Sequence, residues 1–269
     1  MNSWAEAKTD RCLRFAPHKP ISFFVIHRTL ARIERLLRIC RLPSGPALKW
    51  SEPAFSLMEF ETCQALAAGG IHPKLVIDAG ANIGQFALAA TCMLQPEKVI
   101  SFEPVSSAYT ELLALSKRYP CIEPRHLALG SKREKTVIRV ATQTRSSSIL
   151  PLHENHRTAY PLIHQHREEE IIVTTLLDEI PADKYTPILL KLDVQGFELE
   201  VLKGGGDLPG IQWMLVECSS IPYYEGAPVL RDLQAHLEPL GFSIQYPVAS
   251  HRTGTDGPVQ QFDLLFARA

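Results

Sequence analysis

The segment from Val76 to Gly84 constrains the fold of this 269-residue chain more than any other feature of its sequence. It reads VIDAGANIG, so an apolar run is followed by small residues where a buried strand turns sharply into a helix. Gly80 and Gly84 let a ligand approach the backbone closely, although a plain tight turn also explains glycines here. The segment predicts a strand, a turn and a helix at the start of an α/β sheet.

Strands and helices alternate after this unit. The apolar patterns predict helices at residues 84–94 and 106–118 and strands at 74–78, 99–103, 122–129, 170–175, 188–193 and 213–218. Such alternation is typical of a parallel, doubly wound sheet. Beyond a helix at 229–240, strands at 242–246 and 262–267 predict a C-terminal antiparallel hairpin.

The N-terminal residues are expected to form a separate region. Between residues 21 and 42, apolar side chains interleave with five arginines as in a basic amphipathic helix, and the proline-rich stretch 42–53 follows as a linker. We therefore expect an N-terminal helical extension at 1–53 and the main domain at 54–269. The helix either packs its apolar stripe on the main domain or makes peripheral contact with an anionic membrane or a partner.

Composition narrows the class of protein. Hydrophobic residues make up 45% of the chain, and 28 Lys and Arg nearly balance 29 Asp and Glu, so charge gives no argument for nucleic-acid binding. The six cysteines are scattered without a C-x-x-C pair, which fits a reduced compartment. Because no apolar run reaches the length of a membrane span, we expect a cytoplasmic protein. The sequence does not indicate the oligomeric state.

An acidic residue ends the second strand of the predicted sheet. Glu103 lies where open α/β sheets bind ligands, and its carboxylate can accept hydrogen bonds from both hydroxyls of a ribose. A dinucleotide-binding turn would read G-x-G-x-x-G, but Asn82 and Gln85 replace the second and third glycines. The pattern argues against a bound pyrophosphate, so an NAD(P)-dependent oxidoreductase is the weaker alternative.

Two blocks of the sequence resemble the FkbM family of methyltransferases. The first joins D-x-G-A-N-x-G at 78–84 to F-E-P at 102–104, and the second is K-L-D-V-Q-G at 191–196, where Gln195 replaces the family's common glutamate. The resemblance extends from about Leu75 to Ala267 and implies a Rossmann-like, seven-stranded methyltransferase sheet with S-adenosylmethionine as cofactor. It implies that the methionine and ribose portions contact Asp78, Gly80, Asn82 and Gly84, that the ribose is held by Glu103, and that the adenine pocket includes Leu127 and Ala128. An apolar strand end also suits the core equally well at the last two positions.

Acidic residues at two further strand ends indicate the reaction side. Asp193 is expected to face the cofactor crevice, as a general base or as a contact for the substrate or the methionine amino group; a helix N-terminal acid is the alternative. Glu217 and Tyr223 are predicted to contact the substrate. Gln195 supplies neither a base nor a metal-binding carboxylate, so no metal site is predicted. An exposed loop is expected to hold four histidines without ligand spacing: His153, His156, His164 and His166.

These features predict a class I S-adenosylmethionine-dependent methyltransferase. The resemblance to FkbM proteins implies that the acceptor is a hydroxyl on a small molecule, a natural product or a sugar, including a sugar within a glycan. The alternative outside the enzymes is a catalytically silent protein of the same fold that works through interactions.

Overall fold

The computed structural model describes residues 33–42, 45–181, 184–252 and 258–268. The chain divides into two compact units, residues 1–46 and 47–269. Residues 33–41 are helical, in agreement with the predicted amphipathic helix, whose earlier residues lie outside the described part of the chain. The short helix α2 (Gly45–Ser51) follows. Within the described residues, no helix is long and apolar enough to cross a membrane.

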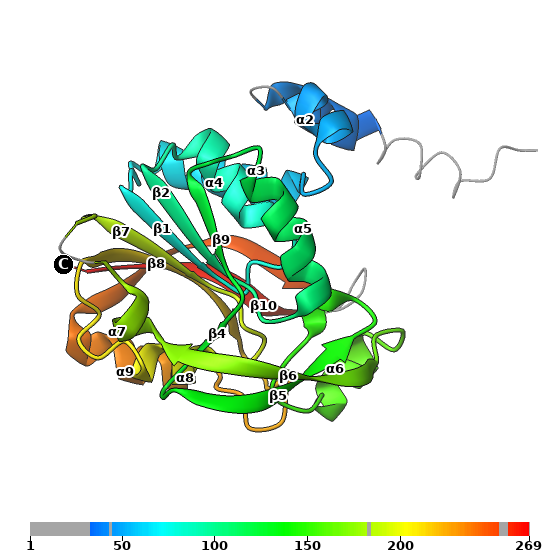
Figure 1. Ribbon diagram of the computed structural model, residues 1–269, viewed down its shortest axis with the longest axis vertical. Helices are drawn as coiled ribbons and strands as arrows, with labels where there is room; N and C mark the ends of the chain where they lie inside the picture. Colours follow the sequence, from blue (N-terminus) through cyan, green and yellow to red (C-terminus); the bar gives the residue numbers. More distant parts are fainter. Residues whose placement is uncertain (1–32, 43–44, 182–183, 253–257, 269) are drawn as a thin grey trace, which may run out of the picture. The chain divides into compact units, whose positions relative to one another are not determined.

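Seven strands form the main sheet of the second unit (Figure 1). Along the sheet these are β3 (Ile122–Arg125), β2 (Lys98–Phe102), β1 (Leu75–Ala79), β7 (Ile188–Leu192), β8 (Ile211–Ser219), β10 (Val259–Arg268) and β9 (Phe242–Arg252). Among these described strands, β10 alone runs in the direction opposite to the other six. The central strands β1 and β7 are buried along their whole length, as in a doubly wound sheet covered on both faces. The predicted sheet and its C-terminal hairpin are confirmed.

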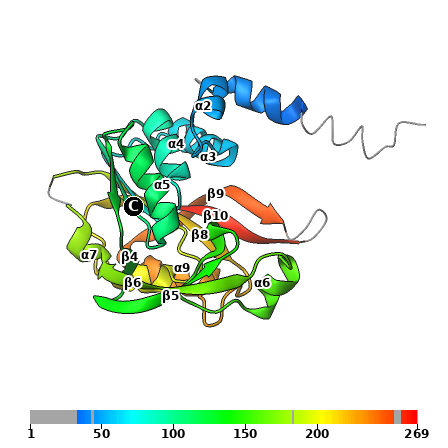
Figure 2. The same cartoon turned by 45° about the vertical axis from the view of Figure 1, so that its right-hand side comes forward.

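Helices lie on both sides of this sheet. In Figures 1 and 2, α3, α4 and α5 lie on one side and α8 and α9 on the other. Their bounds are α3 (Leu57–Ala68), α4 (Gln85–Met93), α5 (Ser106–Ser116), α8 (Glu198–Lys203) and α9 (Leu230–Leu237), which the short η2 (Glu238–Leu240) extends. Connections through helices on the faces of a sheet allow consecutive strands to run parallel. The carboxyl ends of the parallel strands β1, β2, β7 and β8 therefore meet at one edge of the sheet.

A second sheet of three strands forms between β3 and β7 in the chain (Figure 2). It consists of β4 (Ala128–Gly130), β6 (Gln165–Thr175) and β5 (Glu134–Ala141), and the same segment contains η1 (Thr144–Ser146), α6 (Glu154–Ala159) and α7 (Leu176–Glu179). The prediction of one strand at 122–129 is wrong, because β3 ends on the edge of the main sheet and β4 pairs with β6 instead. Pro124 has no amide N–H to donate, which suits an edge strand that ends early.

Candidate active site

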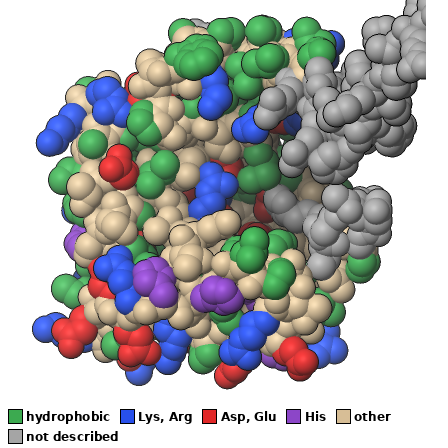
Figure 3. All heavy atoms as spheres, turned by 90° about the vertical axis from the view of Figure 1, so that its right-hand side faces the viewer, with side chains coloured by type: hydrophobic (Ala, Val, Ile, Leu, Met, Phe, Trp, Pro, Cys, Tyr) green, Lys and Arg blue, Asp and Glu red, His purple; other side chains and the backbone are tan. Residues whose placement is uncertain are grey.

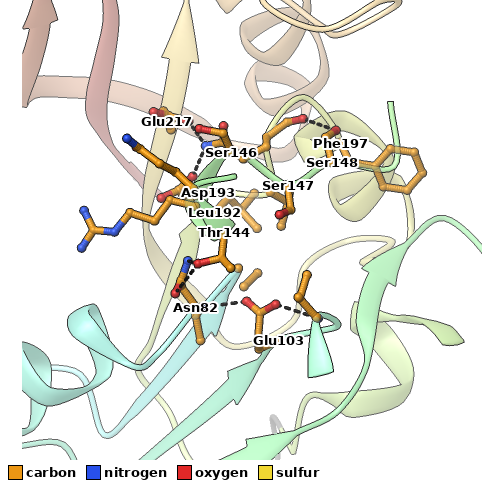
Figure 4. Close-up of a pocket in the computed structure, with 18 of the residues that line it drawn as sticks. Asn82, Glu103, Thr144, Ser146, Ser147, Ser148, Leu192, Asp193, Phe197 and Glu217 are labelled. Atoms are coloured by element: carbon orange, nitrogen blue, oxygen red, sulfur yellow. Dashed lines mark hydrogen bonds between the residues drawn. The ribbon is translucent and has the colours of Figure 1, made fainter. Parts of the chain in front are cut away.

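A cavity of about 570 Å³ lies at the carboxyl ends of β1, β2, β7 and β8. Its opposite wall comes from the segment between β5 and β6, which includes η1 and α6. The lining contains seven of the residues predicted for the site: Gly80, Asn82, Glu103, Leu127, Ala128, Asp193 and Glu217. Figure 4 shows several of them around one space. The structure therefore brings the predicted cofactor and reaction residues together.

Three predicted residues lie outside the lining of this cavity. Asp78 is completely buried in β1, and Tyr223 is buried in the segment after β8. Gly84 is the N-cap of α4 with a φ of 91°, and a Cβ there would meet the side chains of Leu112 and Leu115. A direct contact between these three residues and a ligand stays a prediction. In the structure, all three are packed against other parts of the protein.

Gly80 is required by packing within the chain as well as by any ligand. Its φ is 81°, which favours glycine, and a Cβ at this position would collide with the backbone carbonyl oxygen of Asp193. The close approach brings the ends of β1 and β7 together. Consequently the glycine turn positions Asp193 beside the same cavity that Gly80 lines.

Glu103 connects the glycine turn to the chain that follows β2 through two backbone hydrogen bonds (Figure 4). Its Oε2 accepts from the Asn82 backbone N–H at 2.8 Å, and its Oε1 accepts from the Val105 N–H at 2.7 Å. The Asn82 side chain donates to Thr144 Oγ1 at 3.0 Å, which ties the turn to η1 on the opposite wall. Burial raises the pKa of Glu103 to about 7. Carboxylate oxygens have further lone pairs, so a ribose contact remains compatible with these bonds.

Lys191 is a buried cation between two carboxylates. Its Nζ lies 3.2 Å from Asp193 Oδ2 and 3.7 Å from Asp78 Oδ1. Neither carboxylate oxygen of Asp78 has a hydrogen-bond partner among the described residues, and burial raises the pKa of Asp78 to about 6. Burial disfavours the charged form of Lys191, but attraction by Asp193, Asp78 and Glu59 outweighs it and raises the pKa of the lysine. Sequence reasoning did not assign Lys191 a role, although the K-x-D block contains it.

Gln195 bridges two acidic side chains of the reaction side. Its Nε2 donates to Asp193 Oδ1 at 2.6 Å and to Glu217 Oε2 at 2.8 Å, while its Oε1 accepts from the Tyr224 hydroxyl at 2.6 Å. Burial and the nearby Asp193 raise the pKa of Glu217 well above its ordinary value. Burial also opposes ionisation of Asp193, but Lys191 and the Gln195 hydrogen bond lower its pKa. The two neighbouring carboxyl groups therefore differ, because the pKa of Asp193 lies below its ordinary value and that of Glu217 lies well above it.

Further residues of the cavity were not predicted from sequence. Glu59 reaches it from α3, and burial raises the pKa of its carboxyl to about 7. His156 on α6 also lines the cavity and is 3% exposed, so its predicted place in an exposed loop is wrong. The segment around it folds into α6 and packs on tyrosines that are distant in sequence. On the face in Figure 3, Lys and Arg side chains are interspersed with Asp and Glu, as the balanced composition suggests.

Comparison with known proteins identifies the family. The Methyltransferase FkbM domain matches residues 78–244, which is more than half of the chain. The chain belongs to the FkbM methyltransferase family. Relatives include methyltransferase sdnD of Sordaria araneosa, 26% identical over 219 residues that cover 72% of this chain and 80% of the relative. Methyltransferase 1 of Beauveria bassiana (strain ARSEF 2860) is 24% identical over 186 residues, covering 64% and 73%.

A solved FkbM methyltransferase from Methylobacillus flagellatus KT resembles this chain at 17% identity and a TM-score of 0.48. The match covers 77% of this chain and 47% of that one, so this chain spans about half the length of that relative. As an FkbM methyltransferase, the protein uses S-adenosylmethionine. The lining suits this cofactor, because its sulfonium and ammonium groups are cationic and the carboxyl groups of Glu59, Glu103 and Asp193 line the cavity.

Proposed function

We propose that this FkbM methyltransferase methylates a hydroxyl group on a small molecule, a natural product or a sugar. The observation that carries the proposal is the pair of Asp193 and Glu217 bridged by Gln195 in the cavity wall. The carboxylate of Asp193 can accept a hydrogen bond from an acceptor hydroxyl, and the raised pKa of Glu217 favours the form that donates one to it. Together they can hold an oxygen with a lone pair directed at a methyl group.

Positioning is the main contribution that we assign to these residues. S-adenosylmethionine, when bound, supplies an electrophilic methyl group, and Gly80, Asn82 and Glu103 are the residues proposed to hold it, with Leu127 and Ala128 at the adenine. Holding the acceptor in line contributes up to about 7–11 kcal/mol to lowering a barrier. Because its pKa is lowered, Asp193 is a weak base, so we assign it acceptor or methionine-ammonium binding rather than proton removal.

The test has a binding arm and a transfer arm. Calorimetric titration should give a micromolar dissociation constant for S-adenosylmethionine, about −8 kcal/mol. Formation of S-adenosylhomocysteine is then measured with a panel of alcohols, phenols and monosaccharides, and with matched amines and thiols. Methylation of hydroxyl compounds supports the proposal. Methylation confined to amines or thiols would contradict it and leave the methyltransferase assignment intact.

A further inference from the structure

A buried imidazole lies in the wall of the cavity opposite the glycine turn. His156 belongs to α6 and is 3% exposed, yet it lines the cavity together with Tyr160, Leu162 and Ile163. Its Nδ1 is buried without a hydrogen-bond partner among the described residues. A buried polar atom without a partner is costly, and a site that binds a ligand is one setting in which the cost is tolerated.

Three tyrosine rings surround this imidazole, but their hydroxyl groups have other partners. Ring centroids lie 5.2 Å away for Tyr160, 5.5 Å for Tyr224 and 6.2 Å for Tyr223. The hydroxyl of Tyr160 donates to Gln261, that of Tyr223 to Gln260 and that of Tyr224 to Gln195. The rings therefore fix the plane of the imidazole while its Nδ1 stays available to a bound molecule.

The contacts connect the imidazole to the reaction side of the cavity. Tyr224 packs on His156 and donates to Gln195, which in turn donates to Asp193 and Glu217. We assign proton uptake to neither of these acids, since Lys191 lowers the pKa of Asp193 despite its burial and Gln195 Nε2 already donates to both carboxyl groups. Burial, followed by the neighbouring Arg157, lowers the pKa of His156, so the imidazole is neutral at physiological pH and can take up a proton.

We propose that His156 is a catalytic residue that binds the acceptor hydroxyl and takes up its proton during methyl transfer. The acceptor oxygen forms the bond to the methyl carbon as the carbon–sulfur bond breaks, and that bond pair stays on sulfur. The hydroxyl proton passes to an imidazole nitrogen, which leaves a methyl ether, S-adenosylhomocysteine and an imidazolium. The neighbouring Ala159, Pro161, Leu162 and Ile163 favour a largely apolar acceptor such as a phenol or a cyclic alcohol. This inference rests on the proposed O-methylation.

The test compares two substitutions with a matched control. His156→Gln keeps a hydrogen-bonding group that cannot take up a proton, and His156→Phe keeps a ring without nitrogens. We expect both to lower the turnover of phenols and cyclic alcohols by about 10²–10⁴-fold, while the dissociation constant of S-adenosylmethionine stays within about twofold. The exposed His166→Gln should behave like the wild type. Because His156 contributes an unsatisfied nitrogen, His156→Phe should melt no lower than the wild type.

The pH profile separates proton uptake from packing. As the pH rises, the activity of the wild type should increase with an apparent pKa below that of free imidazole, and His156→Gln should lose this pH-dependent increase. The charged or titratable groups beside His156 are Arg157 and the three tyrosines. Wild-type turnover and an unchanged pH profile in His156→Gln would overturn the assignment while O-methylation stands. If the wild type methylates no hydroxyl compound, the proposed function fails and the role of His156 fails with it.

Discussion

Replacing Lys191 by methionine should destabilise the protein in a pH-dependent way. The substitution keeps the length of the side chain but leaves Asp78 and Asp193 without their cation, which lies 3.7 and 3.2 Å away in the wild type. Removal of one partner from a buried ion pair costs about 3–5 kcal/mol. For a domain of this size, about 2–4 °C of melting temperature corresponds to each kcal/mol, so the loss at pH 8 should be about 6–20 °C.

The sign of the pH dependence follows from Asp78. Its pKa is about 6 in the folded protein against an ordinary value of 3.8, and Lys191 lowers it, so Lys191→Met raises it further. The folded variant then binds more protons than the unfolded chain from about pH 4 to above pH 6, and its stability falls as the pH rises through this window. Differential scanning calorimetry at pH 4.5, 6 and 8 should therefore show a deficit that is smallest at pH 4.5.

A matched control is available on α8. Lys203 pairs with Glu200 in a half-exposed position, and Lys203→Met should cost no more than about 1 kcal/mol. Our reasoning would be refuted by a Lys191→Met variant that melts within 2 °C of the wild type at pH 8. A loss of stability that becomes larger as the pH falls would also refute it, because protonation of Asp78 should reduce the effect of the missing cation.

Three further substitutions test the cofactor turn and the reaction side. Glu103→Gln puts an amide N–H₂ against one of the two backbone donors that Glu103 accepts from. It should weaken S-adenosylmethionine binding at least about 10-fold, or 1.4 kcal/mol, by calorimetry; unchanged affinity would contradict the assignment. Gly80→Ala forces a Cβ into the backbone at the end of β7 and should cost more than about 2 kcal/mol in urea unfolding, clearly more than Gly206→Ala, whose Cβ meets open space. Tyr224→Phe removes the donor to Gln195 and should lower turnover of a hydroxyl acceptor while cofactor affinity stays within twofold; a weaker cofactor complex with intact turnover would argue against this role.

The main sheet was predictable because its strands are continuous apolar runs between turn residues. The predicted ends of β1 and β7 fall within one residue of the observed ends, since each run is bounded by a charged or small residue. The second sheet was not predictable. Its strands β4 and β6 pair across more than forty intervening positions, and β5 begins with two consecutive exposed charged residues, Glu134 and Lys135, which resemble a loop. Strand pairing over such separations depends on tertiary contacts that local periodicity does not contain.

The site was predictable where a motif contains it. Gly80, Asn82, Glu103 and Asp193 lie at strand ends, where the fold itself places ligand sites. The environment of His156 was not, because its burial depends on tyrosines about sixty-seven positions further along the chain. For the same reason, the exposed-loop interpretation failed at this histidine.

The three-stranded sheet has a consequence for how this enzyme diversifies. A large part of the cavity lining comes from one continuous stretch, residues 138–163, while the glycine turn and the strand ends belong to the main sheet. Mutations in that stretch that spare Thr144, the partner of Asn82, can change the shape of the acceptor side and keep this link to the glycine turn. Because acceptor contacts and cofactor contacts come from different segments, the acceptor can change while methyl transfer is kept. Replacing this stretch with that of a relative should therefore alter which acceptors are methylated.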